Sequence, residues 1–319
     1  MDDVDSQGQQ NAGAVAVLGP DRDGALVHAV RQGGGAIRGG QRPRAVVWAG
    51  GPAEDLAAAL AQAPDVRWVQ LPSAGIEDYE DLIGAHAHLA WTCAKSIYGD
   101  SVAEHALALV LALRRGFPEH ATGARWDRDI LVEPLLGSGE IATVLGGGGI
   151  AARFAELVAP FGVHLRVVRR RTESGFDAPH DELLGDDQLH QALTGARVLL
   201  VTLPATAATR GLLGERELRL LAPGAVVVNV GRGSVLDQDA LLRLLDERYL
   251  RGAGLDVTEP EPLPAGHPLW AQPRCLITSH TSNPASWRRT RLAEHVQENV
   301  RRSIAGEQLL GTVDAGAGY

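Results

Sequence analysis

Cysteines and long apolar runs are scarce in this chain of 319 residues. The two cysteines, Cys93 and Cys275, lie far apart and in no spacing typical of a metal site. They therefore fit a reducing compartment and argue against a zinc site. No window holds 18 uninterrupted apolar residues, so the sequence has no obvious membrane-spanning helix. We predict a protein with no bound metal and no membrane partner.

Basic tracts are also missing. The chain has 30 basic and 39 acidic residues, which give a formal net charge of -9. An acidic chain without a basic tract is a poor candidate for binding nucleic acid or an anionic membrane. The first residues, MDDVDSQGQQNAGA, are acidic and polar. They lack the basic and apolar regions of a secretory signal, so we expect a cytoplasmic protein.

Short apolar runs alternate with helix-like stretches along the chain. A length of 319 residues favours two domains over one. Strands rich in Val, Leu and Ile that alternate with helices indicate parallel sheets covered on both faces. We predict an α/β protein of two doubly wound domains, Rossmann-like or flavodoxin-like, with a cleft between them. The predicted strands are Ala14–Leu18, Ala45–Trp48, Arg67–Leu71, Ala142–Leu145, His164–Val168, Val198–Thr202, Ala225–Val230, Gly252–Asp256 and Cys275–Thr278.

Two predicted helices suggest where the domains meet. The segment Val102–Arg115 is apolar on nearly all sides, so we expect it to be deeply buried or at an interface. The segment Pro284–Ala305 has helical periodicity with Arg and Glu on its outer face, and we expect it to return to the first domain. We therefore predict a discontinuous substrate domain, residues 1–115 and 284–319. A dinucleotide-binding domain of residues 116–283 is inserted in it.

A glycine-rich stretch, TVLGGGGIA, follows the predicted strand at Ala142 and opens a helix. Gly146, Gly148 and Ala151 occupy the three small positions of the dinucleotide-binding pattern. They allow a tight turn, close approach of a pyrophosphate and close packing of helix on strand. Gly149 and Ile150 lie between these small positions and are also expected to bind the cofactor, and the helix predicted at Ala152–Val158 points its N-terminus at the phosphates. The alternative is a glycine-rich surface loop in a chain with 38 glycines.

The next predicted strand runs into three arginines, Arg169, Arg170 and Arg171. An NAD-preferring site carries a carboxylate at this position, which binds the ribose 2′-hydroxyl. A guanidinium instead pairs with a 2′-phosphate. We therefore favour NADP(H), with NAD(H) possible, and assign the contact to Arg169 and Arg170. The alternative is a solvated basic turn without any cofactor contact.

Three later strands each deliver one ionisable side chain to the edge where ligands bind in open α/β sheets. These side chains are Arg232, Glu261 and His280. Arginine can hold a carboxylate and polarise a carbonyl, and histidine can protonate an alkoxide near neutral pH. A neighbouring carboxylate orients the ring and stabilises its charged form. Each residue alone has an ordinary structural explanation, so the hypothesis rests on the three together.

These motifs resemble the D-isomer-specific 2-hydroxyacid dehydrogenases, which include glyoxylate/hydroxypyruvate reductases and phosphoglycerate dehydrogenases. The resemblance extends from about Ala45 to the C-terminus and implies catalytic roles for Arg232, Glu261 and His280. Ser279 stands where proline usually precedes the catalytic histidine, but no catalytic group is missing. The most specific stretches are VLGGGGIA, TLPATAATRGLL, LAPGAVVVNVGRGSVLDQDAL, GLDVTEPEPLPAGHPLW and ITSHTSN.

The resemblance also implies binding roles for further residues. It places Asp256 near the nicotinamide carboxamide, and it implies a homodimer. The loop whose backbone donors hold the substrate carboxylate corresponds to Ser73, Ala74 and Gly75, and the cofactor groove is lined at Leu203, Pro204 and Val230.

Together the motifs predict an oxidoreductase that transfers a hydride between NAD(P)H and a small 2-oxo or 2-hydroxy acid, such as glyoxylate or hydroxypyruvate. Two alternatives remain open. One is a catalytically weak, dinucleotide-sensing scaffold of the same fold, since a fold does not by itself determine function. The other is a dehydrogenase of formate or phosphite type with the same cofactor geometry.

Overall fold

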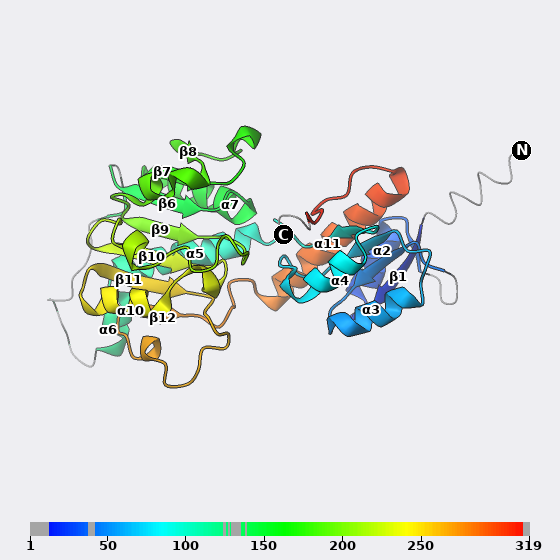
Figure 1. Cartoon of the computed structure of the whole chain (residues 1–319), viewed down its shortest axis with the longest axis horizontal. Coiled ribbons are helices and arrows are strands. Elements are labelled where there is room, and N and C mark those ends of the chain that lie inside the picture. The colour runs from blue at the N-terminus through cyan, green and yellow to red at the C-terminus, as the bar shows by residue number, and fades with distance from the viewer. Residues whose placement is uncertain are drawn as a thin grey trace, which may run out of the picture. The chain divides into compact units, whose positions relative to one another are not determined.

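The structure, a computed structural model, describes residues 13–37, 42–123, 126, 128, 135–137 and 139–314. The chain forms two compact units (Figure 1). The first comprises Met1–Tyr98 and Ala285–Tyr319, and the second comprises Gly99–Pro284. Each unit contains a parallel sheet with helices packed on it, which confirms the predicted α/β class. The ends of the predicted substrate domain, residues 1–12 and 315–319, lie outside the described residues.

The sheet of the first unit has the strand order β2-β1-β3-β4-β5, and every pairing is parallel. This is the flavodoxin-like doubly wound order, with its switch point between β1 and β3. The predicted bounds of β1 and β3 are confirmed, whereas β2 and β5 were not predicted because they span only two and three residues. The strands are β1 (Ala14–Leu18), β2 (Ala36–Ile37), β3 (Ala45–Trp48), β4 (Trp68–Gln70) and β5 (Ala90–Thr92).

The last helix returns to the first unit, as predicted. It is α11 (Ala285–Ala305), and it packs against α2 (Ala25–Gln32). The chain that leaves α2 passes so close to α11 that a Cβ on Gly33 would lie 2.8 Å from the Cβ of Val300, and one on Gly35 would lie 2.9 Å from its Cγ1. The other helices of this unit are α3 (Ala53–Ala61), α4 (Glu80–Ala85) and the short 3-10 turn η1 (Glu77–Tyr79).

The described strands of the second unit form a sheet in the order β12-β11-β10-β9-β6-β7-β8, again with parallel pairings throughout. Read from β8, this is the Rossmann order 3-2-1-4-5-6 with one strand added, and the switch point lies between β6 and β9. Only β8 was not predicted. The strands are β6 (Ile141–Leu145), β7 (His164–Val168), β8 (Glu182–Leu184), β9 (Val198–Val201), β10 (Ala225–Asn229), β11 (Leu250–Leu255) and β12 (Cys275–Ile277).

Helix α5 (Gly99–Arg114) belongs to the second unit by its contacts, whereas the predicted boundary at residue 115 placed it in the first. The helix packs on β10, β11 and α7 (Gly149–Val158). Glycines on β11 make this possible: a Cβ on Gly252 would lie 2.8 Å from Leu113, and one on Gly254 would lie 3.0 Å from Leu109. The apolar surface of α5 is thus largely explained by its own sheet.

The remaining helices of the second unit connect the strands. They are α6 (Phe117–Thr122), α8 (Leu189–Leu193), α9 (Glu215–Leu218) and α10 (Gln238–Asp246), with 3-10 turns η2 (Ala159–Phe161), η3 (Thr172–Ser174), η4 (Asp186–Gln188), η5 (Gly233–Val235) and η6 (Pro268–Trp270).

Within the described residues, no helix is both long enough and apolar enough to cross a membrane. The same residues contain no group of three or more side chains arranged to hold a metal ion. Both cysteines are free thiols, and burial raises the pKa of Cys275 to about 12. A buried thiol with a raised pKa is a poor nucleophile near neutral pH, so Cys275 is not a candidate for catalysis.

Candidate functional site

The glycine-rich stretch forms a strand–turn–helix, as predicted. It connects β6 to α7, and Gly148 caps the helix in an extended conformation. Gly146 has φ +113, and a Cβ there would collide with the Oγ1 of Thr202. Nothing lies within 4 Å of the Cβ position of Gly148, whereas Ala151 is fully buried. The surroundings of the three small residues fit the three positions of the pattern, and their contact with a cofactor remains a prediction.

The beginning of α7 can accept an anion. Its cap is a glycine without a side-chain hydrogen bond, and its first turn contains no acidic residue. No carboxylate of this turn competes for the amides of Gly149 and Ile150, and the helix dipole favours a phosphate there. The residues present fit the diphosphate of a dinucleotide.

Arg169 lies against the same turn. Its amide donates to Leu184 across the β7–β8 pair at 3.0 Å, and its guanidinium donates to the carbonyl of Gly175. The side chain crosses the glycine-rich loop so closely that a Cβ on Gly147 would lie 2.9 Å from the Cβ of Arg169 and 3.2 Å from its Nε. Arg170 is exposed. The two arginines therefore follow β7: Arg169 lies against the glycine-rich loop, and Arg170 is exposed to solvent.

Arg232 lies in a tight turn after β10, with glycine on each side. A Cβ on Gly231 would lie 2.6 Å from the carbonyl oxygen of Leu203, and one on Gly233 would collide with the carbonyl of Thr258. The turn is thus clamped between the segment after β9 and the segment after β11. Arg232 is half-buried, and its Nη1 donates to the carbonyl of Gly231 at 2.9 Å.

Glu261 and His280 are in direct contact. The Nδ1 of His280 lies 2.6 Å from the Oε1 of Glu261, and both side chains are partly exposed, at 50% and 42%. Because Nδ1 faces the carboxylate, Nε2 is the ring nitrogen left to exchange a proton with a ligand. The carboxylate thereby orients the ring. This contact is the most specific chemical feature of the described site.

The backbone of His280 is in the left-handed region, with φ 51. Its amide donates to the carbonyls of Asp256 at 2.9 Å and Thr278 at 3.0 Å, which holds the turn. Since β10, β11 and β12 are neighbours in a parallel sheet, the residues that follow them share one edge. The structure therefore brings Glu261 and His280 together and places Arg232 on the adjacent strand end.

Asp256 ends β11 with a carboxylate that is buried, at 1% exposure. It accepts hydrogen bonds from Oγ1 of Thr278 at 2.6 Å, the amide of Thr281 at 2.9 Å and the amide of Ser282 at 3.2 Å. Burial by itself raises the pKa of Asp256, but the hydrogen bonds from Ser282, Thr278 and Thr281 outweigh burial, so the pKa falls below its ordinary value. Its predicted contact with the nicotinamide remains a prediction.

Asp256→Asn should lower the free energy of unfolding at neutral pH by about 1–3 kcal/mol, because an amide cannot accept from all these donors. A depressed pKa contributes stability that is present above pH about 4 and is lost as the pH falls through the folded value. Urea unfolding measured from pH 7 to pH 3 should therefore show the difference between wild type and variant shrinking only at the acid end. A difference that stays constant over this range would contradict the assignment.

The other predicted cofactor residues follow β9 and β10. Val230 is buried, and its amide donates to the carbonyl of Val201 at 3.1 Å. Leu203 and Pro204 are half-buried, and the carbonyl of Pro204 accepts from the hydroxyl of Thr209 at 2.6 Å. All three lie at the carboxyl edge of the sheet, on either side of the turn that holds Arg232.

Ser73, Ala74 and Gly75 form a loop after β4 in the first unit. The hydroxyl of Ser73 donates to the carbonyl of Gly75 at 2.6 Å, and the amide of Ala94 donates to the carbonyl of Ser73 at 2.8 Å. Within the described part of the chain, the amides of these three residues donate to no backbone carbonyl. Their geometry is compatible with anion binding by the backbone, which remains a prediction.

Two residues near the site were not predicted. Asn229, the fully buried last residue of β10, hydrogen-bonds the turn around Arg232. His105 on α5 places Nε2 3.0 Å from the Oγ1 of Thr278 and 3.7 Å from the Oδ1 of Asp256. An asparagine two residues before Gly-Arg-Gly was the only sequence signal for the first, and no signal indicated the second.

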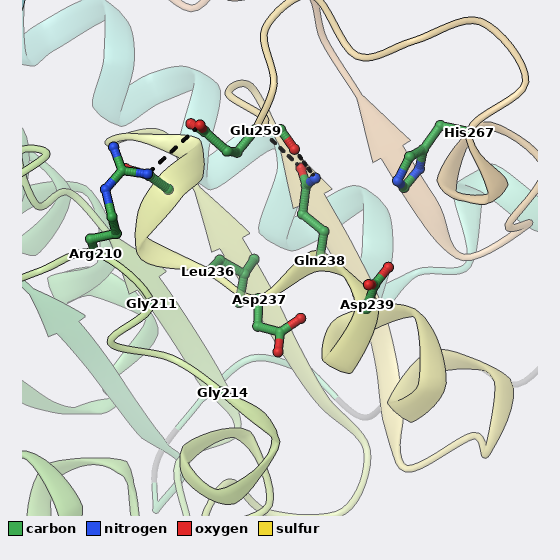
Figure 2. Close-up of a pocket in the computed structure, with 10 residues that line it drawn as sticks. Arg210, Gly211, Gly214, Leu236, Asp237, Gln238, Asp239, Glu259 and His267 are labelled. Atoms are coloured by element: carbon green, nitrogen blue, oxygen red, sulfur yellow. Dashed lines mark hydrogen bonds and ion pairs between the residues drawn. The ribbon is translucent and has the colours of Figure 1, made fainter.

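A pocket of about 490 Å³ lies behind the loop that carries Glu261, and none of the predicted catalytic side chains lines it (Figure 2). There the side-chain amide of Gln238 donates to the carbonyl of Glu259 at 2.6 Å and accepts from its amide at 3.1 Å. Arg210 forms an ion pair with the carboxylate of Glu259 at 3.7 Å. These contacts hold the start of the Glu261 loop, so this pocket supports the site from outside.

Comparisons with known proteins agree with this geometry. Residues 107–282 match the model of the D-isomer specific 2-hydroxyacid dehydrogenase NAD binding domain. A glyoxylate/hydroxypyruvate reductase A of Photorhabdus laumondii is 33% identical over 69% of this chain and 69% of its own length.

Two solved structures extend the comparison to nearly the whole chain. A D-isomer specific 2-hydroxyacid dehydrogenase from Xanthobacter autotrophicus Py2, in complex with NADPH and MES, is 30% identical and superposes with a TM-score of 0.78 over 96% of this chain and 99% of its own. A putative formate dehydrogenase from Pyrobaculum aerophilum is 26% identical, with a TM-score of 0.75 over 95% and 99% of the two chains.

Proposed function

Because the chain belongs to the D-isomer specific 2-hydroxyacid dehydrogenase family, whose members are NAD(P)-dependent oxidoreductases, we propose that it reduces a small 2-oxo acid such as glyoxylate or hydroxypyruvate. The product would be the D-2-hydroxy acid where C2 is chiral. The observation that carries this proposal is the contact of 2.6 Å between His280 and Glu261 at the sheet edge that also presents Arg232.

The three side chains divide the reaction between them. Arg232 binds the substrate carboxylate and polarises the 2-oxo group by charge-assisted hydrogen bonds. A bound reduced dinucleotide supplies the hydride to C2. The Nε2 proton of His280 passes to the oxygen that gains charge, and Glu261 orients the ring for that transfer. In the oxidative direction, neutral His280 accepts the hydroxyl proton.

The backbone amides of Ser73, Ala74 and Gly75 are proposed to bind the anionic end of the substrate. The beginning of α7, with Gly146, Gly148 and the two residues after it, is proposed to bind the diphosphate of the cofactor. Both assignments depend on amide groups rather than side chains, so substitutions that add bulk test them better than substitutions that remove charge.

Glu261→Gln should lower kcat/KM for hydroxypyruvate by about 10-fold or more. The neutral amide is a weaker partner for Nδ1 of His280 than the carboxylate, so the ring is held less firmly in the orientation that presents Nε2. The measurement is kcat/KM for hydroxypyruvate at about pH 7, with the Kd for NADPH as the check that cofactor binding is retained. If the variant has the kcat/KM of wild type, Glu261 does not act through His280.

NADPH is the proposed cofactor, with preference from Arg169 and Arg170. Each guanidinium can give a 2′-phosphate a charge-assisted hydrogen bond of about 1.5–3 kcal/mol, which NADH cannot receive. The ratio of kcat/KM for NADPH over NADH should exceed one and should fall at least about tenfold in Arg169→Asp/Arg170→Ala. High salt should weaken NADPH binding more than NADH binding.

Arg171→Ala is the matched control for this prediction, since Arg171 is the exposed next residue of the same run. It should leave the cofactor ratio near that of wild type. A wild-type preference for NADH that the double variant does not change would overturn the NADPH proposal and leave the dehydrogenase proposal intact.

The function is tested by turnover of purified protein with a panel of substrates. Glyoxylate and hydroxypyruvate are assayed with NADPH and NADH, and formate is assayed with the oxidised forms because a formate-type neighbour shares the fold. Oxidation of the reduced cofactor by the 2-oxo acids supports the proposal. Activity with formate alone would favour the formate-type alternative, and binding of dinucleotide without any turnover would favour the sensing scaffold.

A homodimer in the cytoplasm is also proposed. The apolar helix α5, which was expected to be buried or at an interface, packs on β10, β11 and α7 of its own unit. The proposal of a dimer therefore rests on the family resemblance, and light scattering of the purified protein decides it.

A further inference from the structure

We propose that Asn229 is a positioning residue for Arg232, an inference that rests on the proposed function. Asn229 would not bind the substrate itself. It would hold the turn in which Arg232 presents its guanidinium, so that recognition of the substrate carboxylate depends on a buried amide at the end of β10.

The side-chain amide of Asn229 forms hydrogen bonds with the backbone of both Gly231 and Arg232. Its Nδ2 donates to the carbonyl of Arg232 at 2.9 Å, and its Oδ1 accepts from the amide of Gly231 at 3.0 Å. The carbonyl of the same Gly231 accepts from Nη1 of Arg232 at 2.9 Å. Asn229 thus fixes the backbone on both sides of the Arg232 Cα atom, and through Gly231 it also holds the group that the guanidinium contacts.

The surroundings leave this bracing role to Asn229. Its side chain is fully buried, so water cannot readily replace either hydrogen bond. The turn itself is made permissive by Gly231 and Gly233, which have no side chains to restrict it. Both must be glycine, because the backbone of Leu203 leaves no room for a Cβ on Gly231 and the backbone of Thr258 leaves none on Gly233. A flexible sequence in a crowded place needs a specific hydrogen-bonding partner to hold one conformation.

The identity of the side chain follows from this arrangement. One atom must donate to a carbonyl and the other must accept from an amide, and among residues of this size only asparagine offers both. Aspartate has the same shape, but its second oxygen would oppose the carbonyl of Arg232. Alanine would leave both backbone groups without their partner in a buried place.

The test compares Asn229→Ala and the isosteric Asn229→Asp with wild type. Both should lower kcat/KM for hydroxypyruvate by about 10- to 100-fold, because a misplaced guanidinium loses transition-state contacts. The Kd for NADPH should change by less than about threefold, and the shape of the pH profile should be unchanged, since Glu261 and His280 are intact. On an Arg232→Ala background, Asn229→Ala should cause no further loss beyond about threefold.

Gln272→Ala is the matched control. Gln272 is also a buried amide in the second unit, at 7% exposure, and it too donates to one group, Asp246 at 2.7 Å, and accepts from another, the amide of Arg274 at 3.2 Å. It lies before β12, at the opposite edge of the sheet. The Gln272→Ala variant should have a lower free energy of unfolding in urea but the kcat/KM of wild type. This result would separate the positioning of Arg232 from the general cost of removing a buried amide.

Hydrogen exchange provides a readout that does not depend on turnover. The peptide spanning residues 230–236 should exchange faster in both Asn229 variants than in wild type, with no change in a peptide covering β12. Unchanged exchange in this segment would overturn the proposal, and so would multiplicative losses in the double variant. Inactive wild-type protein with faster exchange in the variants would instead refute the proposed function and leave the brace established.

Discussion

Replacing Arg232 with alanine should lower kcat/KM for a 2-oxo acid by about 100-fold or more, equivalent to about 3 kcal/mol of transition-state binding. Arg232 is the cation at the sheet edge where the histidine–glutamate pair lies, and the clamped turn gives it a defined place. Loss of a charge-assisted clamp removes both orientation of the carboxylate and polarisation of the carbonyl. The Kd for the dinucleotide should stay within about threefold, because the cradle is built from other elements.

Steady-state kinetics and cofactor titration by fluorescence measure both quantities on the same preparation. Arg197→Ala is the control, since Arg197 precedes β9 at the amino edge of the same sheet and donates to the carbonyl of Pro223. That variant should behave as wild type. An Arg232→Ala enzyme with nearly normal kcat/KM would remove Arg232 from the catalytic assignment.

His280→Asn should lower kcat by roughly 10²- to 10⁴-fold, the usual span for a lost general acid. Asparagine is the appropriate substitution because the residue has φ 51, a conformation that asparagine tolerates better than most residues. It can keep a hydrogen bond to Glu261 but cannot deliver a proton near neutral pH. The loss should therefore appear in kcat, with dinucleotide affinity retained.

A second histidine–glutamate pair provides a matched control for this prediction. His164 lies 2.6 Å from Glu182, and its side chain is 40% exposed, so its pairing resembles that of His280. It begins β7 at the amino edge of the sheet, away from the carboxyl edge that holds the catalytic candidates. His164→Asn should retain the kcat of wild type. Equal losses in the two variants would mean that histidine–glutamate pairing matters for folding rather than for proton transfer.

The sequence predicted the nucleotide-binding sheet well because its buried strands are nearly continuous runs of apolar residues. The bounds of β7 agree with the prediction, and the ends of β10 and β12 differ from it by one residue. Strands β2, β5 and β8 were not predicted because they are short and their sequences, AI, AWT and ELL, do not belong to a longer apolar run. The assignment of α5 also differed, since an apolar helix alone does not reveal which sheet covers it.

The candidate site was predictable where one rule of topology applied. Residues after parallel strands meet at one edge, so the sequence alone is enough to group Arg232, Glu261 and His280. The direct contact of His280 with Glu261 depends on the path of a loop of irregular structure, which no periodicity encodes. The role of Asn229 depends on two hydrogen bonds inside a turn, and the sequence around a single asparagine does not indicate which groups its side chain will bond.

Isotope transfer tests the central claim, hydride transfer to C2 of a 2-oxo acid, most directly. Hydroxypyruvate is incubated with the enzyme and reduced cofactor labelled with deuterium at C4 of the nicotinamide, and the product is resolved by chiral chromatography and mass spectrometry. With the label on the transferred face, we expect D-glycerate with one deuterium at C2 from the wild-type enzyme, and almost none from Arg232→Ala or His280→Asn. Unlabelled product with the cofactor labelled on either face, the L-isomer, or equal product from both variants would contradict it.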